Sequence, residues 1–445
     1  MFPFYIKKIS PRHQSAWLMG AVILFLLLQV SGGKALGQIY IDIDSPAVRK
    51  FAIASPDFLN LDPKSGNREL ERALPEVLMN ALDISGFFEP LDRDAYLQGK
   101  TVSLSRRDLR LKDWSIIGAE LLVLGAFSCV GDTLEVEVKV YDVFWGREIL
   151  GKRLLGDCRH YRQTMHRIGN DLIKLLTGGE GMFLTKIAFV GDMTGHKEIY
   201  TCSFDGKDVK QLTFDKEMAL FPSFSKDGSK LIYNSYKDNE GILVMRDMRS
   251  GRVSTVSSRK GLNLGGAWSP DGESIALTFS DGGEQALYRI NFKGSKPVRL
   301  TEHYGINVSP TFSPDGDRLA FVSNRSGSPQ IYVLDLKDGT EERITYEGSY
   351  NTSPDWSSTG RIAFVSMNDG VFDIYTMNPD GSGTARLTYG QNDNEDPSWS
   401  PDGRYIVFSS NRTGSHHLYL MDAWGENERR ITHMDGEQMT PCWGP

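Results

Sequence analysis

The sequence predicts a multidomain chain in which an N-terminal α/β sandwich domain is followed by a six-bladed β-propeller. Three observations support this prediction: a short motif recurs at a nearly fixed period, each period contains four β-rich runs, and the first and last periods are incomplete in complementary ways. Successive motifs lie 44, 44, 44, 43 and 44 residues apart, and a fixed period in this range is typical of repeat architectures. The motif is an aromatic residue followed by Ser-Pro-Asp-Gly or a looser form of it, and its aromatic residues are Phe224, Trp268, Phe312, Trp356, Trp399 and Trp443.

Each period has the internal order expected of one propeller blade. In the period that begins at Phe312, an Asp-Gly turn is followed by the β-rich run Arg318–Val322, a polar turn, a second run Gln330–Leu334 and a short final run Arg343–Thr345. The aromatic residue itself ends a further run, so each period supplies four short strands joined by tight turns. Such a unit forms one antiparallel sheet, and sheets of this kind stack in a ring around a channel.

The two ends of the repeat region complete each other. Three runs, Lys186–Val190, Glu198–Thr201 and Gln211–Thr213, have no aromatic-led strand before them, whereas the terminal run Thr440–Trp443 has nothing after it. Joining them gives a sixth blade made from both ends of the region, and closure of this kind removes exposed sheet edges. We therefore expect a six-bladed β-propeller over residues 185–445, closed by the C-terminal strand.

The first 37 residues have the composition of a secretory signal peptide. Basic residues precede an apolar run over residues 16–30, and Ala35 and Gly37 supply the small residues of a cleavage site. The apolar run is short for a helix that spans a bilayer, although an uncleaved anchor is the alternative. We expect removal of residues 1–37, a mature chain that begins near Gln38, and a location outside the cytoplasm.

Residues 38–178 are expected to form the α/β domain, joined to the propeller by a glycine-rich linker at 179–184 that permits a hinge of limited range. The run at 134–140 alternates apolar and polar residues, which predicts a sheet with one solvated face. Pro75 lies inside one predicted helix and is expected to break or restart it. The predicted strands cover residues 51–54, 120–125, 134–140 and 148–150, and the predicted helices cover 67–84, 108–117 and 161–176.

The alternating segment at the start of the mature chain has two interpretations. It can form an edge strand of the α/β domain, or a free arm that binds a partner by adding a strand to the partner's sheet. The pattern alone leaves both open. The segment consists of Gln38, Ile39, Tyr40, Ile41, Asp42, Ile43 and Asp44.

The four cysteines are expected to behave differently in the two domains. Cys202 and Cys442 fall on the third and first strands of the closing blade, and strands two apart are separated by roughly 9–10 Å. This separation exceeds the reach of a disulfide, so we expect both to be unpaired. Cys129 and Cys158 lie at strand ends in the α/β domain, where an exported protein can pair them or leave them free.

Composition and motifs argue against several functional classes. A net charge of −7 and an isoelectric point near 5.7 argue against nucleic acid as a general partner. The sequence has no His-Glu-x-x-His, no glycine-rich phosphate loop and no Gly-x-Ser-x-Gly, so we expect no catalytic residue, metal or cofactor. His416 and His417 are adjacent on a predicted strand, so their rings point to opposite faces and cannot chelate one metal.

The recurring motif residues also have structural explanations. The aspartates of the Asp-Gly turns are expected to hydrogen-bond their own backbone, and service as calcium ligands is the alternative. The leading aromatics recur at a spacing that places them at contacts between blades, and stacking on a ligand is the alternative.

A polar position recurs five residues before each motif aromatic. Asparagine occupies it in four periods, and Ala219 and Gln438 occupy it in the other two. Strand direction puts these connections on one rim of the propeller, at the channel mouth, together with two Asn-Arg turns. Asparagine in a turn is usually a local backbone cap, but uncharged amides around a channel mouth also suit the docking of a peptide or loop. The expected rim residues are Asn263, Asn307, Asn351, Asn394, Gln438, Arg325 and Arg412.

The layout of the whole chain resembles the TolB family, the periplasmic component of the Tol–Pal envelope system of Gram-negative bacteria. The resemblance rests on the export signal, the short linker, the blade motifs Trp-Ser-Pro-Asp-Gly, Ile-Ala-Phe and Leu-Thr, and the terminal Trp-Gly-Pro. It also rests on the pattern Leu82-x-x-Ser85-Gly86-x-Phe88-x-x-Leu91-Asp92 in the α/β domain. A blade motif alone is shared by many propellers, whereas the full layout is much more specific.

The resemblance implies a non-enzymatic scaffold that supports outer-membrane integrity and cell division, and we expect a periplasmic monomer without cofactors. It implies that the loops of the recurring asparagines bind the peptidoglycan-associated lipoprotein Pal. It implies that the arm at 38–44 binds TolA, which favours the arm over the edge strand. Leu262 aligns with a rim histidine of the family, and the arm departs from the family in Tyr40 and its two aspartates.

Two other functions stay open from the sequence. The first is a propeller accessory to a peptidase, or a propeller hydrolase, and the missing nucleophile motif argues against it. The second is a peptidoglycan- or carbohydrate-binding propeller, which needs exposed aromatic residues at the channel mouth. The motif aromatics are instead expected to be buried.

Overall fold

The computed structural model describes residues 49–63, 66–97, 103–105, 108–237, 241–281, 283–294, 296–390 and 392–445. The predicted signal peptide at 1–37 and the predicted arm at 38–44 lie outside the described residues. Within the described ranges, no helix has the length and apolar character needed to cross a bilayer.

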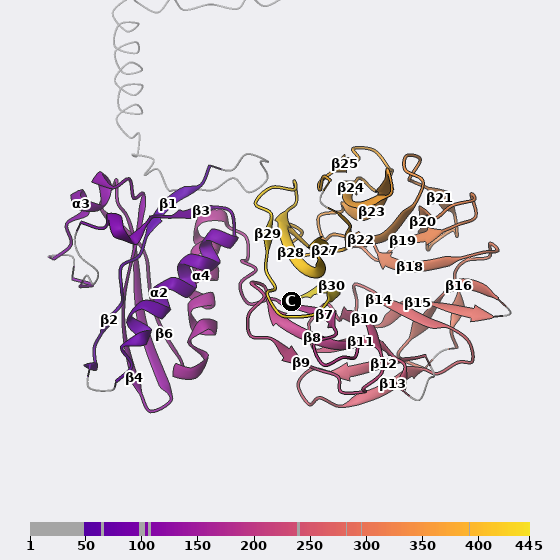
Figure 1. Ribbon diagram of the computed structural model, residues 1–445, viewed down its shortest axis with the longest axis horizontal. Helices are drawn as coiled ribbons and strands as arrows, with labels where there is room; N and C mark the ends of the chain where they lie inside the picture. The colour runs from indigo at the N-terminus through magenta and orange to yellow at the C-terminus, as the bar shows by residue number, and fades with distance from the viewer. Residues whose placement is uncertain are drawn as a thin grey trace, which may run out of the picture. The chain divides into compact units, whose positions relative to one another are not determined.

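One mixed sheet with helices forms the first domain, in the order β3-β1-β4-β5-β6 (Figure 1). The strand β1 is parallel to both of its neighbours, whereas β4, β5 and β6 form an antiparallel meander. The last three strands are much longer than predicted, and β5 alternates buried and less buried residues as expected for a sheet with one solvated face. The strands are β1 (Phe51–Ala54), β2 (Leu59–Asn60), β3 (Phe88–Pro90), β4 (Leu121–Val130), β5 (Thr133–Asp142) and β6 (Arg147–Asp157).

The prediction that Pro75 interrupts its helix is wrong, because α2 (Glu69–Ile84) runs through it without a break. Proline cannot donate to the carbonyl four residues earlier, which leaves the oxygen of Glu71 without its helical partner. The backbone N–H of Phe58 donates to that oxygen at 2.7 Å, so the lost bond is replaced from outside the helix. The other two helices, α3 (Leu111–Ile116) and α4 (Tyr161–Thr177), match their predictions to within a few residues.

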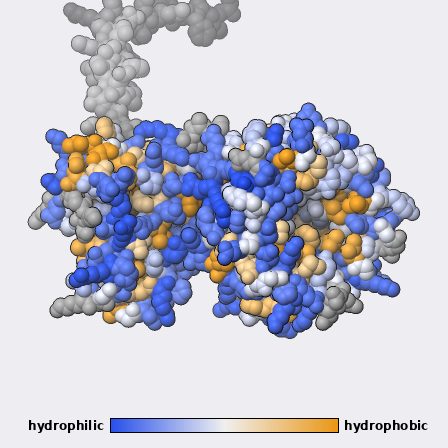
Figure 2. All heavy atoms as spheres, in the orientation of Figure 1, coloured by the Kyte–Doolittle hydropathy of each residue, from blue (hydrophilic) through white to orange (hydrophobic). Residues whose placement is uncertain are grey.

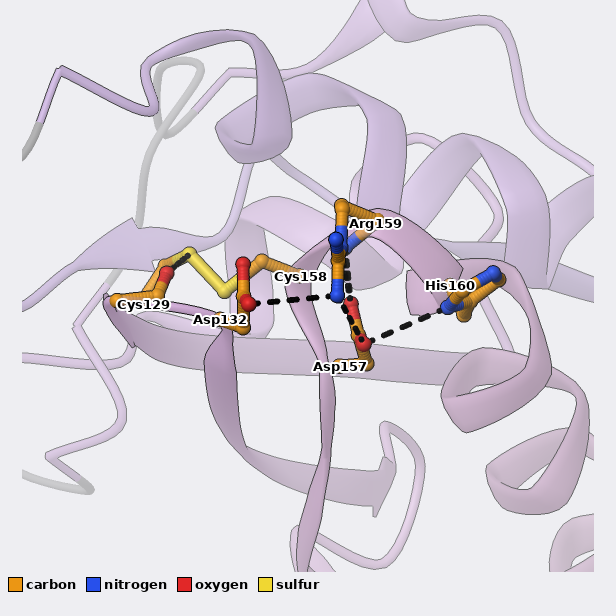
Figure 3. Close-up of a disulfide and its surroundings, with 7 residues drawn as sticks. Cys129, Asp132, Asp157, Cys158, Arg159 and His160 are labelled. Carbon is orange, nitrogen blue, oxygen red and sulfur yellow. Dashed lines mark hydrogen bonds and ion pairs between the residues drawn. A yellow bond between two sulfur atoms is a disulfide. The ribbon is translucent and has the colours of Figure 1, made fainter.

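A disulfide joins Cys129 near the end of β4 to Cys158, which follows β6 (Figure 3). The Cα atoms lie 6.2 Å apart, and the N–H of Cys158 donates to the carbonyl of Asp132 at 2.9 Å. Arg159 pairs with both Asp132 and Asp157 at 3.3 Å (Figure 3). The bridge closes a loop of 29 residues, a constraint worth about 3–4 kcal/mol in the chain-entropy account. Cys202 and Cys442 are free, as predicted.

The connection between the α/β domain and the propeller is partly packed: Phe183 is buried, whereas Glu180 and Leu184 are exposed. Helix α4 ends at Gly178, whose φ of 75° is the left-handed conformation that glycine adopts at helix ends. Phe183 is buried, its N–H donates to the Asn170 side chain at 3.1 Å, and its ring lies 5.2 Å from that of Phe204. The linker therefore begins at the end of α4 and is held near its other end by the contacts of Phe183. A hinge of limited range in this linker stays a prediction.

Six four-stranded antiparallel sheets form the propeller, which confirms the predicted blade count. Blade 1 contains β10 (Ala219–Phe224), β11 (Lys230–Ser235), β12 (Ile242–Asp247) and β13 (Val253–Ser257); blade 2 contains β14 (Asn263–Trp268), β15 (Ser274–Asp281), β16 (Glu284–Asn291) and β17 (Val298–Arg299); blade 3 contains β18 (Asn307–Phe312), β19 (Arg318–Ser323), β20 (Gln330–Asp335) and β21 (Glu341–Arg343). Blade 4 contains β22 (Asn351–Trp356), β23 (Ile362–Asn368), β24 (Val371–Met377) and β25 (Ala385–Arg386), and blade 5 contains β26 (Asn394–Trp399), β27 (Tyr405–Thr413), β28 (Ser415–Asp422) and β29 (Arg429–Arg430).

Blade 6 is built from both ends of the repeat region, as predicted. The C-terminal strand β30 (Gln438–Gly444) pairs with β7 (Lys186–Gly191), which is followed by β8 (Glu198–Ser203) and β9 (Lys210–Gln211). Trp443 lies opposite Ile187 in an antiparallel register. In Figure 1 the yellow C-terminal strand accordingly lies beside the magenta strands that begin the ring.

The motif aromatics pack between neighbouring blades, as their spacing predicted. Trp399 belongs to a buried cluster that includes Ile374 of blade 4 and Ile406 of its own blade. Its backbone N–H donates to the carboxylate of Asp355 in blade 4 at 2.7 Å. Burial raises the pKa of Asp355 to about 6, despite this bond. Each inner strand is thus tied to the blade before it by apolar contact and, here, by a backbone hydrogen bond.

Candidate partner-binding surface

The recurring asparagines are fully buried, so they do not form the exposed ring of amides that the sequence suggested. Asn307 and Asn351 have no exposed surface. The Nδ2 of Asn351 donates to the carbonyl of Glu347 and to Oε1 of Gln330 in blade 3, both at 2.8 Å. Asn307 makes the equivalent bonds to the carbonyls of His303 and Gln285 at 3.1 and 3.0 Å. These side chains therefore fix the loop before each inner strand and tie it to the preceding blade.

The remaining members of the predicted set are also buried behind the loops. Asn263 and Asn394 are buried, and Asn394 donates to Asp373 of blade 4 at 3.2 Å. Gln438 takes the same place in blade 6, where its Oε1 lies 2.6 Å from Nδ1 of His417. We name the loops that precede the inner strands, together with the turns of Arg325 and Arg412, the asparagine rim. These loops are 213–218, 258–262, 302–306, 346–350, 389–390 with 392–393, and 433–437.

Arg325 and Arg412 lie on the asparagine rim and are clamped in the same way, which the sequence did not show. Arg325 donates to Oδ1 of Asn307 and to Oγ of Ser323, both at 2.9 Å, and pairs with Glu341. Its guanidinium lies over the ring of Tyr332, 4.6 Å from the centroid. Each arginine thereby fastens the turn between the second and third strands to the loop before the inner strand.

The clamp of Arg412 in blade 5 repeats these contacts. Arg412 donates to Asn394 at 2.6 Å and to Ser410 at 2.9 Å, pairs with Glu428, and lies 4.3 Å from the ring centroid of Tyr419. Burial lowers the pKa of Arg412.

Exposed apolar side chains, several of them aromatic, project from the asparagine rim, and the sequence analysis missed them. Tyr304, Tyr346 and Tyr389 are 82%, 73% and 64% exposed. The motif aromatics themselves are largely buried, as expected. The signal was present in the sequence as the residue that follows Leu-Thr or Ile-Thr in several blades. The exposed set is Phe214, Met218, Leu262, Tyr304, Ile306, Tyr346, Tyr350 and Tyr389.

Two of these tyrosines are held in place by their own blades. The hydroxyl of Tyr346 donates to the carbonyl of Arg343 at 2.8 Å, and the guanidinium of Arg343 lies 5.0 Å from the ring centroid. Tyr389 and Arg386 repeat this arrangement at 2.9 and 4.9 Å. A surface whose aromatic side chains are already fixed loses little conformational entropy when a partner binds.

Much of the visible surface is hydrophilic, interrupted by small apolar patches (Figure 2).

Two glutamates and a histidine add charge to the same rim. His416 lies 2.8 Å from a carboxylate oxygen of Glu437 and 3.4 Å from one of Glu395. Hydrogen bonding to Glu395 raises the pKa of His416, so the two carboxylates favour the charged form of its ring. Among the described residues, no group of three or more histidine, cysteine or acidic side chains is placed to hold a metal ion.

The Asp-Gly turns occupy the opposite face of the ring. The Asp271 carboxylate accepts from the hydroxyl of Ser269 at 2.5 Å and from the N–H of Glu273 at 2.9 Å, and Gly272 has a φ of 70°. The hydroxyl of Ser269 is the main cause of the lowered pKa of Asp271. These contacts fit the structural role predicted for the turns. The channel opens on this face in a hollow of about 400 Å³ between the ends of the inner strands.

Comparison with known families gives two matches that together span most of the chain. The model of the TolB beta propeller domain matches residues 173–445, and that of the TolB amino-terminal domain matches residues 39–149. The first match ends within β6 and the second begins within α4, so the first covers most of the α/β domain and the second covers all six blades.

Individual relatives give the same result. The chain is 38% identical over 232 residues to the Tol-Pal system protein TolB of Desulfosudis oleivorans, covering 52% of this chain and 53% of the relative. It is 36% identical over 250 residues to that of Syntrophus aciditrophicus, covering 54% and 55%. The chain thus spans about half the length of these curated relatives. The crystal structure of TolB from Acinetobacter baumannii matches with a TM-score of 0.79 and 26% identity, covering 92% of this chain and all of that one.

Proposed function

Because the chain belongs to the TolB family, we propose that it is a non-enzymatic periplasmic scaffold of a Tol–Pal system. The family match covers both domains, and relatives carry the name of that system. Binding of Pal at the propeller and of TolA at the N-terminal arm would connect the two sides of the envelope, and so support outer-membrane integrity and cell division.

The exposed tyrosines of the asparagine rim are the observation that best supports docking of Pal there. Exposed aromatic side chains on a rigid scaffold are characteristic of binding surfaces, and tyrosine is enriched among residues that dominate binding energy. The buried asparagines and the clamped Arg325 and Arg412 contribute by fixing the loops rather than by touching the partner. The docking surface is thus the loop set 302–306, 346–350 and 389–390 with 392–393 rather than the amides behind it.

A carbohydrate-binding propeller is the second candidate, and the same tyrosines favour it. Aromatic faces at a channel mouth can stack on sugar rings, and Tyr304 is exposed on the rim. The two candidates differ in their ligand. The scaffold binds the folded periplasmic domain of Pal, whereas the carbohydrate-binding propeller binds peptidoglycan fragments when Pal is absent.

The double variant Tyr346→Ser/Tyr389→Ser tests the proposal. We expect the dissociation constant for the soluble domain of Pal to rise by about tenfold or more, since two exposed aromatic contacts are lost. Isothermal titration calorimetry measures this, with binding of muropeptides as the second titrant. Phe144→Ser is the matched control, because Phe144 is likewise well exposed, at 82%, but lies in the first domain. Unchanged Pal affinity in the double variant contradicts rim docking.

Deleting residues 38–44 tests the second half of the proposal with the same assay. We expect the shortened protein to keep its affinity for Pal and to lose capture of the periplasmic domain of TolA. Loss of both interactions would argue against separate sites.

A further inference from the structure

Blade 4 lacks the arginine that its two neighbours clamp. Aligned on the inner strand and the serine opposite it, Arg325 of blade 3 and Arg412 of blade 5 correspond to Asn368 in blade 4. This blade is also the one whose period is 43 rather than 44 residues, and its second and third strands meet in a tight turn at Asp369 and Gly370, with φ of 50° and 83°. The side chain of Asn368 donates to the hydroxyl of Tyr375 instead of reaching inward.

In blades 3 and 5 an asparagine Oδ1 accepts a hydrogen bond from arginine, whereas the equivalent oxygen of blade 4 has no partner among the described residues. The Oδ1 of Asn307 and that of Asn394 each accept from a guanidinium. The Oδ1 of Asn351 is buried and has no hydrogen-bond partner among the residues that the structure describes. A buried carbonyl oxygen left unpaired destabilises the protein, so a hydrogen-bond donor from outside the chain is favoured there.

Two further contacts of the clamp, the serine and the tyrosine, have counterparts in blade 4. Ser366 lies opposite Asn351 in the register, as Ser323 lies opposite Asn307. Tyr375 takes the position of Tyr332, which is 6% exposed beneath its arginine, but it is only half-buried. Gly348 borders the same space: a Cβ there would collide with Oγ of Ser366 and lie 3.2 Å from Oδ1 of Asn351.

From this arrangement we infer that Asn351, Ser366 and Tyr375 form a slot for a guanidinium, supplied by an arginine of the protein that docks on the asparagine rim. The inference rests on the proposed function and names the contact by which the partner is recognised. Thr384 stands where blades 3 and 5 have Glu341 and Glu428, so the slot offers an amide oxygen, a hydroxyl and a ring but no carboxylate from that position. This set selects guanidinium, which is planar and weakly hydrated, over ammonium.

Asn368→Arg gives the chain its own occupant for the slot. We expect the melting temperature to stay the same or rise, because the new side chain repeats the clamp of Arg325, and the dissociation constant for the soluble domain of Pal to rise about tenfold to a hundredfold. Weaker binding by a protein that is no less stable cannot be ascribed to misfolding. An unchanged dissociation constant overturns the inference.

A second variant blocks the slot from the other side. Gly348→Ala places a methyl group between Ser366 and Asn351, at a position with φ of 79°. Gly339→Ala is its control, since Gly339, in the turn between β20 and β21, also has positive φ, 78°, but a Cβ there meets nothing within 4 Å. We expect only the first to weaken Pal binding by a similar factor, and equal effects of both variants contradict the slot.

Arginines of Pal, each changed to lysine, complete the test in a double-mutant cycle. One such change should weaken binding to the wild-type chain about tenfold, which corresponds to 1.4 kcal/mol. The same change should not weaken binding to the Asn368→Arg variant any further, because the slot of that variant is already filled. If wild-type protein binds Pal but no arginine couples to the slot, only water or another group occupies it and the inference is wrong. If wild-type protein does not bind Pal at all, the proposed function fails instead.

Discussion

Deletion of residues 438–445 is expected to abolish the cooperative unfolding of the propeller. These residues form β30, the inner strand of blade 6, and their loss would expose the edges of β7 and of the inner strands on either side. Trp443 is buried, its backbone N–H donates to Oγ of Ser398 at 3.0 Å, and its ring nitrogen donates to Oγ1 of Thr185 at 2.8 Å. A ring opened in this way has unpaired strands that promote aggregation.

Differential scanning calorimetry and size-exclusion chromatography measure this effect. Removal of Pro445 alone is the control, because this exposed residue follows the last strand. We expect the control to unfold like the complete chain, and the deletion to aggregate or to lose the propeller transition. A deletion variant that stays monomeric and melts cooperatively at the wild-type temperature would mean that closure does not stabilise the ring.

Trp356→Ala is expected to lower the free energy of unfolding by about 3–5 kcal/mol. Trp356 is 7% exposed and packs with Ile331 of blade 3 and Ile362 of its own blade. Its backbone N–H donates to Thr311 of blade 3 at 3.2 Å, and its ring nitrogen donates to the carbonyl of Gly360 at 3.1 Å. The substitution leaves a cavity between two blades and an unpaired carbonyl, both of which destabilise the fold.

Urea denaturation followed by far-ultraviolet circular dichroism measures this loss. Trp145→Ala is the matched control, because the same side chain is 64% exposed in the first domain, where truncation should change stability by at most about 0.5 kcal/mol. Equal effects of the two substitutions would show that Trp356 does not hold neighbouring blades together.

The propeller could be predicted closely because its determinants are local and repeated. The motif period set the number of blades, and the unmatched ends at Thr440–Trp443 and Lys186–Val190 set the closure. The first domain was less predictable, since the length of its strands and the continuity of α2 depend on distant groups. Nothing near Pro75 in the sequence shows that the N–H of Phe58 bonds the carbonyl of Glu71.

The position of the asparagine rim in the fold could be predicted but its detail could not, and its role in binding stays a prediction. Asparagine five residues before the motif aromatic in four blades located the asparagine rim, yet burial of Asn351 and its neighbours depends on how the loops fold over them. Exposure of Tyr346 and Tyr389 could not be predicted from the motif, because these tyrosines follow the short outer strands and do not belong to the motif aromatics. The difference between Asn368 and Arg412 becomes informative only when the blades are compared in three dimensions.

The central claim is that the asparagine rim, and not the face of the Asp-Gly turns, binds Pal. Amide hydrogen exchange with and without the soluble domain of Pal tests it most directly, because both faces are measured in one experiment. Binding should slow exchange in loops 302–306 and 346–350 and leave turns 270–272 and 314–316 unchanged. Slowed exchange at those turns with none in the two loops would contradict the account.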